Sequence, residues 1–189
     1  DLESQVSKML LIGGAVRYEH YSDFGDTVIG KFSARVDFDP RFAVRGTISN
    51  GFRAPGIQQA LYSQRSTNLN SAGVLTDTLT ARQDSELTRA FGIPPLQEET
   101  SRNYSAGIVA RPTELFRLTV DVYRIDIDDR IIFSSNLQPE PIEQCGTAAG
   151  CPIRTILDPL GVGQILFFTN AVDTKTTGVD IVGLYDWEL

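Results

Sequence analysis

The sequence predicts an all-β protein made of antiparallel up-and-down strands of a transmembrane β-barrel, with about six strands in this partial barrel and the long loops on one edge. Three observations predict this fold class. Apolar and polar residues alternate through several segments, short turns alternate with long polar connections, and no run of about 18 apolar residues offers a transmembrane helix. We expect residues 1–189 to form one β-barrel segment, with external loops at about 54–98 and 134–164.

Each predicted strand places apolar side chains on one face and polar side chains on the other. The alternation is clearest where Phe32, Ala34 and Val36 interleave with Ser33 and Arg35. A period of two residues is typical of a sheet whose faces meet two different solvents. The predicted strands span about residues 6–22, 29–38, 42–53, 99–111, 115–133 and 165–186.

Two local irregularities are expected within this pattern. In the strand over residues 115–133 the apolar phase shifts between Val122 and Tyr123, and a shift of this kind predicts a β-bulge. A weak helical period over residues 81–91 predicts a short helix inside the first long loop.

The lengths of the connections favour a membrane barrel over a soluble sandwich. Tight turns at residues 39–41 and 111–114 are two strands apart, so they fall on the same edge of the sheet. The turn near residue 23 and both long loops fall on the opposite edge. Outer-membrane barrels have this asymmetry, whereas a β-sandwich has loops of mixed length at both ends. A secreted β-sandwich that binds carbohydrate through its long loops is the alternative.

Charge and motif content argue against two other classes of function. The net charge is −7 and the basic residues are scattered singly, whereas nucleic-acid binding requires a clustered basic surface. The only histidine, His20, has no serine, cysteine or aspartate partner at a nucleophile's usual spacing, so we expect an interfacial residue there and no hydrolase. No catalytic residue, metal site or cofactor is predicted.

The two cysteines, Cys145 and Cys151, enclose a short glycine-containing segment. Such a segment is flexible enough to meet disulfide geometry, and a disulfide would indicate an oxidising compartment. A metal site and a pair of free thiols are the competing interpretations; a structural zinc site needs four ligands, and no histidine or further cysteine lies nearby. A bridge over so short a loop would stabilise the fold by about 2 kcal/mol.

Charged residues near the strand ends invite interpretation as ligand sites. Asp126, Asp128 and Asp129 could bind calcium, but alternation places Asp126 and Asp128 on one face with Arg124, so a solvated, charge-paired strand end is the better interpretation. A second group is expected to form a ladder of alternating charge on the barrel interior. Its members are Asp173, Lys175 and Asp180.

Several sequence blocks resemble the C-terminal barrel half of TonB-dependent outer-membrane receptors. The most specific is Asn50-Gly51-Phe52-Arg53-Ala54-Pro55-Gly56, which contains the "GFRAP" signature at the point where a strand ends in a long loop. Each block falls at the strand position that the alternation predicts. The blocks are residues 15–25, residues 45–56 with Gln58 and Gln59, residues 98–101 with 120–131, and residues 168–180.

The resemblance implies a receptor, not an enzyme, in the outer membrane of a Gram-negative bacterium. It implies active uptake of a scarce nutrient such as a ferric siderophore, cobalamin or an oligosaccharide. The implied partners are outer-membrane lipid, a plug domain of the same parent chain and the TonB system, which supplies energy. The candidate ligand-binding residues are Arg53, Gln58, Gln59 and Arg65. Alternation points Arg53 into the interior, toward an anionic ligand or a plug carboxylate.

The sequence also departs from the complete family pattern. It carries no plug domain, no TonB-contacting box and no terminal aromatic strand after Leu189. Plugged transporters of this kind need roughly 22 strands. We therefore expect a fragment that cannot transport alone and that self-associates through its open strand edges.

Overall fold

The structure is a computed structural model that describes residues 1–22, 25–69 and 73–187. The chain divides into two compact units. The sheet unit comprises residues 1–53, 98–128 and 173–189, and the loop unit comprises residues 54–97 and 129–172. The sequence predicts a turn near residue 23, and two of its residues, Asp23 and Phe24, lie outside the described residues.

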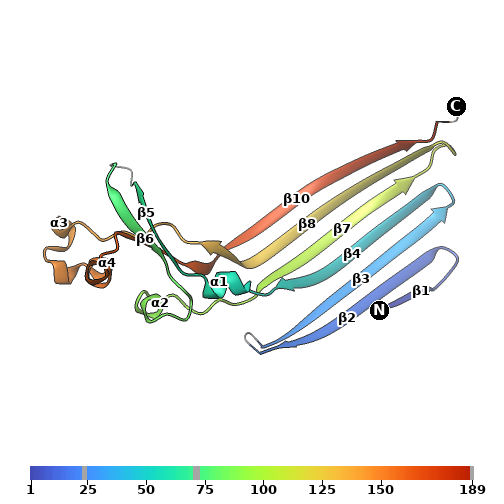
Figure 1. Ribbon diagram of the computed structural model, residues 1–189. Helices are drawn as coiled ribbons and strands as arrows, with labels where there is room; N and C mark the ends of the chain where they lie inside the picture. Colours follow the sequence, from blue (N-terminus) through green and yellow to red (C-terminus); the bar gives the residue numbers. More distant parts are fainter. Residues whose placement is uncertain (23–24, 70–72, 188–189) are drawn as a thin grey trace. The chain divides into compact units, whose positions relative to one another are not determined.

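A seven-stranded sheet with the order β1-β2-β3-β4-β7-β8-β10 confirms the predicted all-β fold (Figure 1). The strand pairs from β1 to β8 are all antiparallel. Within the described residues β1 and β10 are free edges, so the sheet is not closed. The strands are β1 (Leu2–Gln5), β2 (Leu10–Tyr21), β3 (Gly25–Asp39), β4 (Phe42–Arg53), β7 (Glu99–Ala110), β8 (Phe116–Phe133) and β10 (Phe168–Tyr185).

The register gives the sheet an apolar face and a polar face. Phe32 pairs with Ile48, and Ile48 pairs with Tyr104, so the three side chains form one row across β3, β4 and β7. They are 50%, 54% and 45% exposed, so the described residues of the sheet unit do not cover this row. The neighbouring row on the opposite, polar face consists of Ser33, Thr47 and Ser105.

An ion pair on the polar face spans three strands because the strand between its partners carries a glycine. Arg45 on β4 and Asp121 on β8 both pair with Gly107 on β7. Arg45 Nε lies 3.0 Å from Asp121 Oδ1, and Arg45 Nη2 lies 2.6 Å from Asp121 Oδ2. A Cβ atom at Gly107 would lie only 1.9 Å from Asp121 Oδ1 and 3.0 Å from the Val120 carbonyl oxygen. Glycine is therefore required here for the two-pronged ion pair.

Replacing Gly107 with alanine is expected to destabilise the sheet by about 1–3 kcal/mol, because the new methyl group displaces the Asp121 carboxylate from Arg45. Gly46→Ala on the adjacent strand is the matched control, since its Cβ would meet the nearest atom at an ordinary 3.6 Å. Guanidinium titration of the two variants measures the difference. Equal stability of the two variants would contradict the proposed role of Gly107.

The predicted β-bulge at Val122 and Tyr123 is wrong. β8 pairs with β7 without a register shift through this point. The apolar phase changes because the two faces of the sheet change character at this point. On the face of Val122 the next residue is the charged Arg124, and on the face of Tyr123 the next residue is the apolar Ile125. The backbone irregularity of this strand lies further along, at Asp129, whose φ is 57°.

Other strand boundaries also differ from expectation. The strand predicted over residues 6–22 begins at Leu10, and the separate strand β1 pairs with it, which raises the strand number of the sheet above the expected six. The strand predicted over 165–186 is interrupted at Phe167, between β9 (Gln164–Leu166) and β10. The β-sandwich alternative is wrong, because all strands of the sheet unit belong to one sheet.

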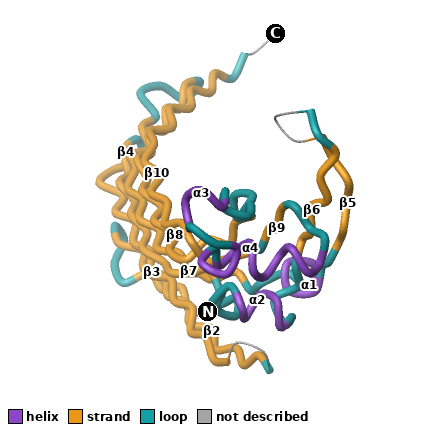
Figure 2. The backbone as a smooth tube through the Cα atoms, turned by 90° about the vertical axis from the view of Figure 1, so that its left-hand side faces the viewer, coloured by secondary structure: helices purple, strands orange, loops and turns teal. Residues whose placement is uncertain are grey.

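The long connections are folded, and they form the loop unit. Strands β5 (Gln64–Leu69), β6 (Leu75–Thr80) and β9 make a small sheet in which β5 and β6 are antiparallel and β6 and β9 are parallel. The helix predicted within 81–91 is present as α2 (Glu86–Ala90), and Figure 2 shows the helices in purple. The other helices are α1 (Ile57–Leu61), α3 (Ile142–Cys145), η1 (Ala148–Gly150), α4 (Pro152–Leu157) and η2 (Asp158–Leu160).

The loop unit has a hydrophobic core of its own. Phe167, Leu157 and Ile165 are each fully buried. Phe91 packs its ring against Phe167, with ring centroids 5.2 Å apart. Residues from both long connections therefore share one core. None of the described helices is long and apolar enough to cross a membrane.

Candidate functional site

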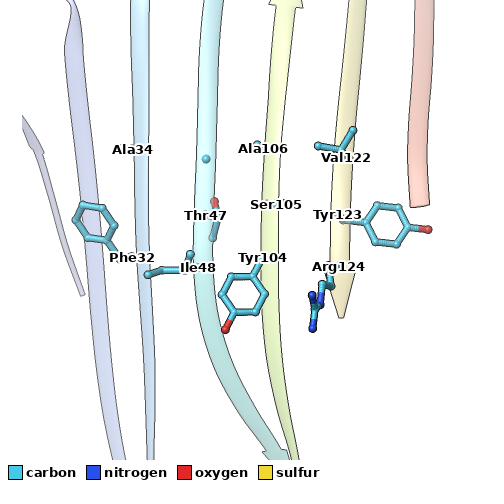
Figure 3. A pocket seen from close by; sticks show the side chains of 11 residues that line it. Phe32, Ala34, Thr47, Ile48, Tyr104, Ser105, Ala106, Val122, Tyr123 and Arg124 are labelled. Carbon is cyan, nitrogen blue, oxygen red and sulfur yellow. The ribbon is translucent and has the colours of Figure 1, made fainter. Parts of the chain in front are cut away.

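The apolar face of the sheet carries a shallow furrow of about 570 Å³ (Figure 3). Its floor consists of the small residues Ala34, Gly46 and Ala106, and larger side chains such as Phe32 and Tyr104 stand beside it. Exposed apolar side chains on both sides of a furrow of small residues make a surface that water solvates poorly.

The apolar face ends in charged rows. Arg124 Nη2 lies 2.9 Å from Asp126 Oδ2, and Arg102 Nη2 lies 3.9 Å from Asp128 Oδ2. This geometry supports the predicted charge-paired strand end, because the carboxylates of Asp126 and Asp128 each face an arginine. Asp129 follows with its left-handed backbone, and its carbonyl oxygen accepts a hydrogen bond from Asn170 Nδ2 at 2.6 Å.

His20 lies near the end of the β2–β3 hairpin and contacts a carboxylate. Its Nδ1 is 2.5 Å from Asp26 Oδ1, and Tyr18 Oη donates to the same oxygen at 2.8 Å. The His20 and Asp26 side chains are 70% and 57% exposed. His20 therefore has an aspartate partner six positions away, which the sequence pattern did not identify.

Arg53, the first candidate ligand residue, forms a two-pronged ion pair with Glu99. The two residues pair directly across β4 and β7, and Arg53 Nε donates to Glu99 Oε2 at 2.8 Å. The Glu99 side chain is 8% exposed, whereas the Arg53 side chain is 55% exposed. Because a buried carboxylate is costly without a cation, Arg53 is required for the neutralisation of Glu99.

Gln58 and Gln59 lie in helix α1. The Gln59 side chain caps this helix, since its Oε1 accepts a hydrogen bond from the Gly56 backbone nitrogen at 2.9 Å. Gln58 contributes its carbonyl oxygen to the helix end, through a bond from the Tyr62 nitrogen at 2.9 Å. The Gln58 side chain is exposed and makes no hydrogen bond within the described part of the chain.

Arg65 joins distant segments of the loop unit. Its Nε donates to Asp77 Oδ2 at 2.9 Å, and its Nη1 and Nη2 donate to the carbonyl oxygens of Leu160 and Gly161 at 3.2 Å and 2.8 Å. These carbonyls end the 3₁₀ helix η2, where a cation is favoured. The guanidinium therefore connects β5 to β6 and to a segment far along the chain.

Asp77 is charged in this network. A hydrogen bond from Thr67 Oγ1 at 2.5 Å, together with the guanidinium of Arg65, holds the pKa of Asp77 below its usual range. A carboxyl group with a lowered folded-state pKa stabilises the fold above its unfolded pKa of about 3.9, and that contribution is lost as the pH falls through the folded-state pKa.

Acidification is therefore expected to leave the β5–β6 hairpin intact down to about pH 4 and to loosen it below that value. An NMR titration of the Asp77 carboxyl carbon provides the measurement, and Asp77→Asn should remove this acid dependence. Asp84→Asn is the control, because Asp84 pairs with Arg82 and not with the hairpin. A titration of Asp77 at or above the ordinary carboxyl value would contradict the prediction.

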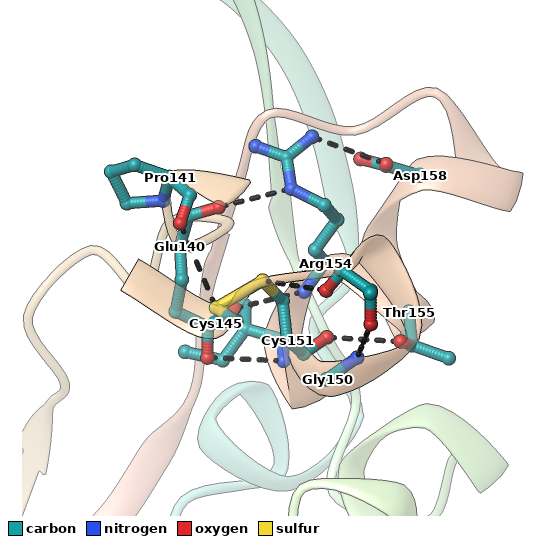
Figure 4. The surroundings of a disulfide bond; sticks show 10 residues. Glu140, Pro141, Cys145, Gly150, Cys151, Arg154, Thr155 and Asp158 are labelled. Atoms are coloured by element: carbon teal, nitrogen blue, oxygen red, sulfur yellow. Dashed lines mark hydrogen bonds and ion pairs between the residues drawn. A yellow bond between two sulfur atoms is a disulfide. The ribbon is translucent and has the colours of Figure 1, made fainter. Parts of the chain in front are cut away.

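Cys145 and Cys151 are joined in a disulfide with their Cα atoms 5.3 Å apart, as the sequence predicts (Figure 4). The Glu140 carboxylate caps the start of α4 by accepting hydrogen bonds from the backbone nitrogens of Ile153 and Arg154 at 3.3 Å and 3.2 Å. Glu140 and both cysteines lie close enough to suggest a metal site, but the sulfur atoms are bonded to each other and provide no thiolate.

The partners of the candidate residues were not visible in the sequence. Asp77 lies 12 positions from Arg65 and Glu99 lies 46 positions from Arg53, so no local spacing connects them. Only the strand register brings Glu99 opposite Arg53. An alternating pattern that fixed both strands could have revealed that pair, whereas nothing in the sequence placed Arg65 beside Gly161.

Comparisons with known proteins agree with this geometry. The family model described as TonB dependent receptor-like, beta-barrel matches residues 2–189. A comparison with curated proteins found no match.

Solved structures of similar fold include siderophore and hemophore receptors. The siderophore receptor PirA from Pseudomonas aeruginosa has a TM-score of 0.67 and 18% identity, over 95% of this chain and 29% of that chain. A mutant of the ferric enterobactin receptor PfeA from the same organism, in complex with enterobactin, has a TM-score of 0.67 and 16% identity, over 95% and 23%. A mutant of the Serratia marcescens hemophore receptor HasR, in complex with HasA and heme, has a TM-score of 0.53 and 13% identity, over 94% and 28%.

At these identities the similarity shows the fold. The chain spans less than a third of the length of each of these receptors.

Proposed function

Because the chain belongs to the TonB-dependent receptor-like β-barrel family, we propose that it is part of an outer-membrane receptor for active uptake of a scarce nutrient. The family consists of receptors and transporters of the Gram-negative outer membrane, so we propose no enzymatic activity. The observation that carries the proposal is the two-faced sheet, whose exposed apolar rows alternate with polar rows along the same strands.

In the proposed arrangement the apolar face meets outer-membrane lipid and the polar face lines the barrel interior. A lipid-facing surface needs no protein partner, which accounts for the exposure of Phe32 and Ile48. The interior meets water and the plug domain of the same parent protein, for which ion pairs such as Arg45–Asp121 are suited. TonB contacts the parent protein and supplies the energy for transport.

We propose a ferric siderophore as the transported nutrient, ahead of cobalamin or an oligosaccharide. The support is that PirA and PfeA, with the same TM-score, are a siderophore receptor and a ferric enterobactin receptor. HasR, which is in complex with a hemophore and heme, is also similar in fold, so the fold alone does not select the nutrient.

Of the candidate ligand residues, Gln58 is the one whose side chain is uncommitted within the described structure. We propose that its amide contacts the ligand. The side chains of Arg53, Gln59 and Arg65 each hold neighbouring segments in place, and their proposed contribution is to shape the binding surface through those contacts.

The proposed function is tested by uptake under iron limitation. A strain that lacks the gene for the protein carrying this chain is expected to lose uptake of an iron-55-labelled siderophore, and reintroduction of the gene should restore it only when TonB is present. Gln58→Ala should weaken uptake, whereas Gln144→Ala, which alters another exposed glutamine of the loop unit, in helix α3, is the control. Restored uptake without TonB would overturn the proposal.

The open edges of the sheet suggest a further property of the isolated chain. Among the described strands, β1 and β10 are the two edges of the sheet, and edge strands tend to pair with other strands. We propose that the isolated chain does not transport and that it self-associates. Size-exclusion chromatography without detergent tests this, since a stable monomer would contradict it.

A further inference from the structure

A second cavity lies at the short-turn edge of the sheet unit, and it is lined by residues of the turns after β1, β3 and β7. Figure 1 shows these turns along the same edge of the sheet. It has a volume of about 400 Å³. Residues from both faces of the sheet line it, and most of the strand residues among them lie on the polar face. The furrow on the apolar face shares none of its lining residues.

Both acidic residues of this pocket already have partners. Asp37 forms an ion pair with Arg35, whose Nη2 lies 2.8 Å from Asp37 Oδ1. Asp39 Oδ1 accepts hydrogen bonds from the backbone nitrogens of Arg41 and Phe42 at 2.7 Å and 2.8 Å.

The basic residues exceed the acidic ones. Besides Arg35, the pocket is lined by Lys8, Arg41 and Arg111, so four cations face the two carboxylates. The side chains of Lys8, Arg41 and Arg111 make no ion pair or hydrogen bond among the residues that the structure describes. In a chain of net charge −7, such a local surplus of positive charge stands out.

Backbone contacts hold these cations in neighbouring positions. The Arg111 nitrogen donates to the Arg41 carbonyl oxygen at 2.7 Å, and the Asp37 nitrogen donates to the Met9 carbonyl oxygen at 2.8 Å. These bonds hold the backbone of Arg41 against that of Arg111, and the backbone of Met9, next to Lys8, against that of Asp37, while the three cationic side chains are exposed at the turns. Glu114 and Arg117 follow in the chain, but they do not line the pocket.

We propose that this pocket binds an acidic peptide segment that carries two or more carboxylates. Lys8 precedes β2, Arg41 precedes β4 and Arg111 follows β7, so the cations are one and two strand spacings apart, or about 5 and 10 Å. A single phosphate is too small to contact all three. An extended peptide places alternate side chains about 7 Å apart, so two such steps span about 14 Å, comparable with the three strand spacings from Lys8 to Arg111.

The chemistry of the pocket favours arginine–carboxylate recognition. A guanidinium binds a carboxylate through two parallel hydrogen bonds, and Arg41 and Arg111 provide two such groups. Phe38 and Phe42, whose ring centroids are 5.6 Å apart, also line the pocket and offer contact to an apolar residue of the segment. The proposed function would place this short-turn edge in the periplasm, whereas the binding itself does not rest on that function.

The experiment measures fluorescence anisotropy of a fluorescein-labelled peptide of alternating aspartate and glycine, titrated with the whole protein that carries this chain, folded in detergent micelles. Binding is expected to weaken roughly tenfold or more in the variant with both Arg41→Gln and Arg111→Gln, because charged hydrogen bonds are lost. It should also weaken as salt is raised. Lys31→Gln, which removes a cation from the same sheet but outside this pocket, is the matched control and should bind as the unaltered chain does.

Several results would overturn the proposal. They are equal binding of a peptide with asparagine in place of aspartate, an equal loss in Lys31→Gln, and displacement of the peptide by inorganic phosphate at equal concentration. Circular dichroism verifies folding of each variant. Variants with Arg41→Lys and Arg111→Lys keep the charge but lose the two parallel hydrogen bonds, so they should bind more weakly than the unaltered protein and more tightly than the glutamine variants. Binding as weak as with glutamine would contradict the charge of the pocket as the source of the binding. These outcomes do not depend on whether the parent protein transports iron.

Discussion

Replacing Phe167 with alanine is expected to destabilise the loop unit by about 3–5 kcal/mol, the usual cost of removing a buried phenylalanine side chain. Phe167 is fully buried, packs against Phe91 and belongs to the same core as Leu157 and Ile165. Alanine would leave a cavity between segments that the small β5-β6-β9 sheet cannot close by moving, because its register is fixed by hydrogen bonds.

Hydrogen exchange at two amides measures this loss. Ile165 and Leu137 donate to each other's carbonyl oxygens at 2.9 Å, so their amides report the opening of the core. Each 1.4 kcal/mol of lost stability accelerates exchange from the open state by about tenfold. Phe133→Ala is the control: Phe133 is 42% exposed and has one ring contact, to Phe168, so its loss should cost far less. Similar exchange rates in the two variants would contradict the view that the long connections form one cooperative core.

The strands of the sheet unit could be predicted because each strand has one apolar face and one polar face, and this requires alternating residue types. Alternation of Phe32, Ala34 and Val36 with Ser33 and Arg35 is a local signal, and the register confirms it row by row. The false β-bulge at Val122 arose from the same rule. Where the apolar face gives way to the charged rows, the pattern changes phase although the backbone does not.

The loop unit could not be predicted in the same way, because its strands are polar and its contacts are distant in sequence. The polar sequence of β5 is typical of a loop. Strand β6 pairs with the parallel strand β9, in which Gln164 lies opposite Thr78. The sequence identified the types of residue in the candidate site, but it did not identify the residues that they contact. Arg65 has the chemistry of an anion-binding residue, yet its donors go to Asp77 and to two backbone carbonyls.

The orientation of the sheet in a membrane leads to a second large expected effect, which depends on two neighbouring residues. Ala106 lies on the apolar face and Ser105 on the polar face; both are exposed and both are small. Ala106→Arg is expected to cost about 2–4 kcal/mol in a bilayer, because it places a charge against lipid near the middle of the apolar band. Ser105→Arg places the same charge in the polar row with Thr47, where water reaches it, and should cost little.

The measurement is guanidinium titration of the protein that carries this chain, folded into phosphatidylcholine vesicles. Ala106→Leu separates charge from size, because leucine fills the same furrow without a charge and should be tolerated by lipid. If the apolar face were instead packed against another protein layer, leucine and arginine at position 106 would both be destabilising, since neither fits a close-packed interface. If the polar face met lipid, the order of the two arginine variants would be reversed. A large loss of stability in Ala106→Arg, with little loss in Ser105→Arg and Ala106→Leu, is therefore expected only if the apolar face meets lipid.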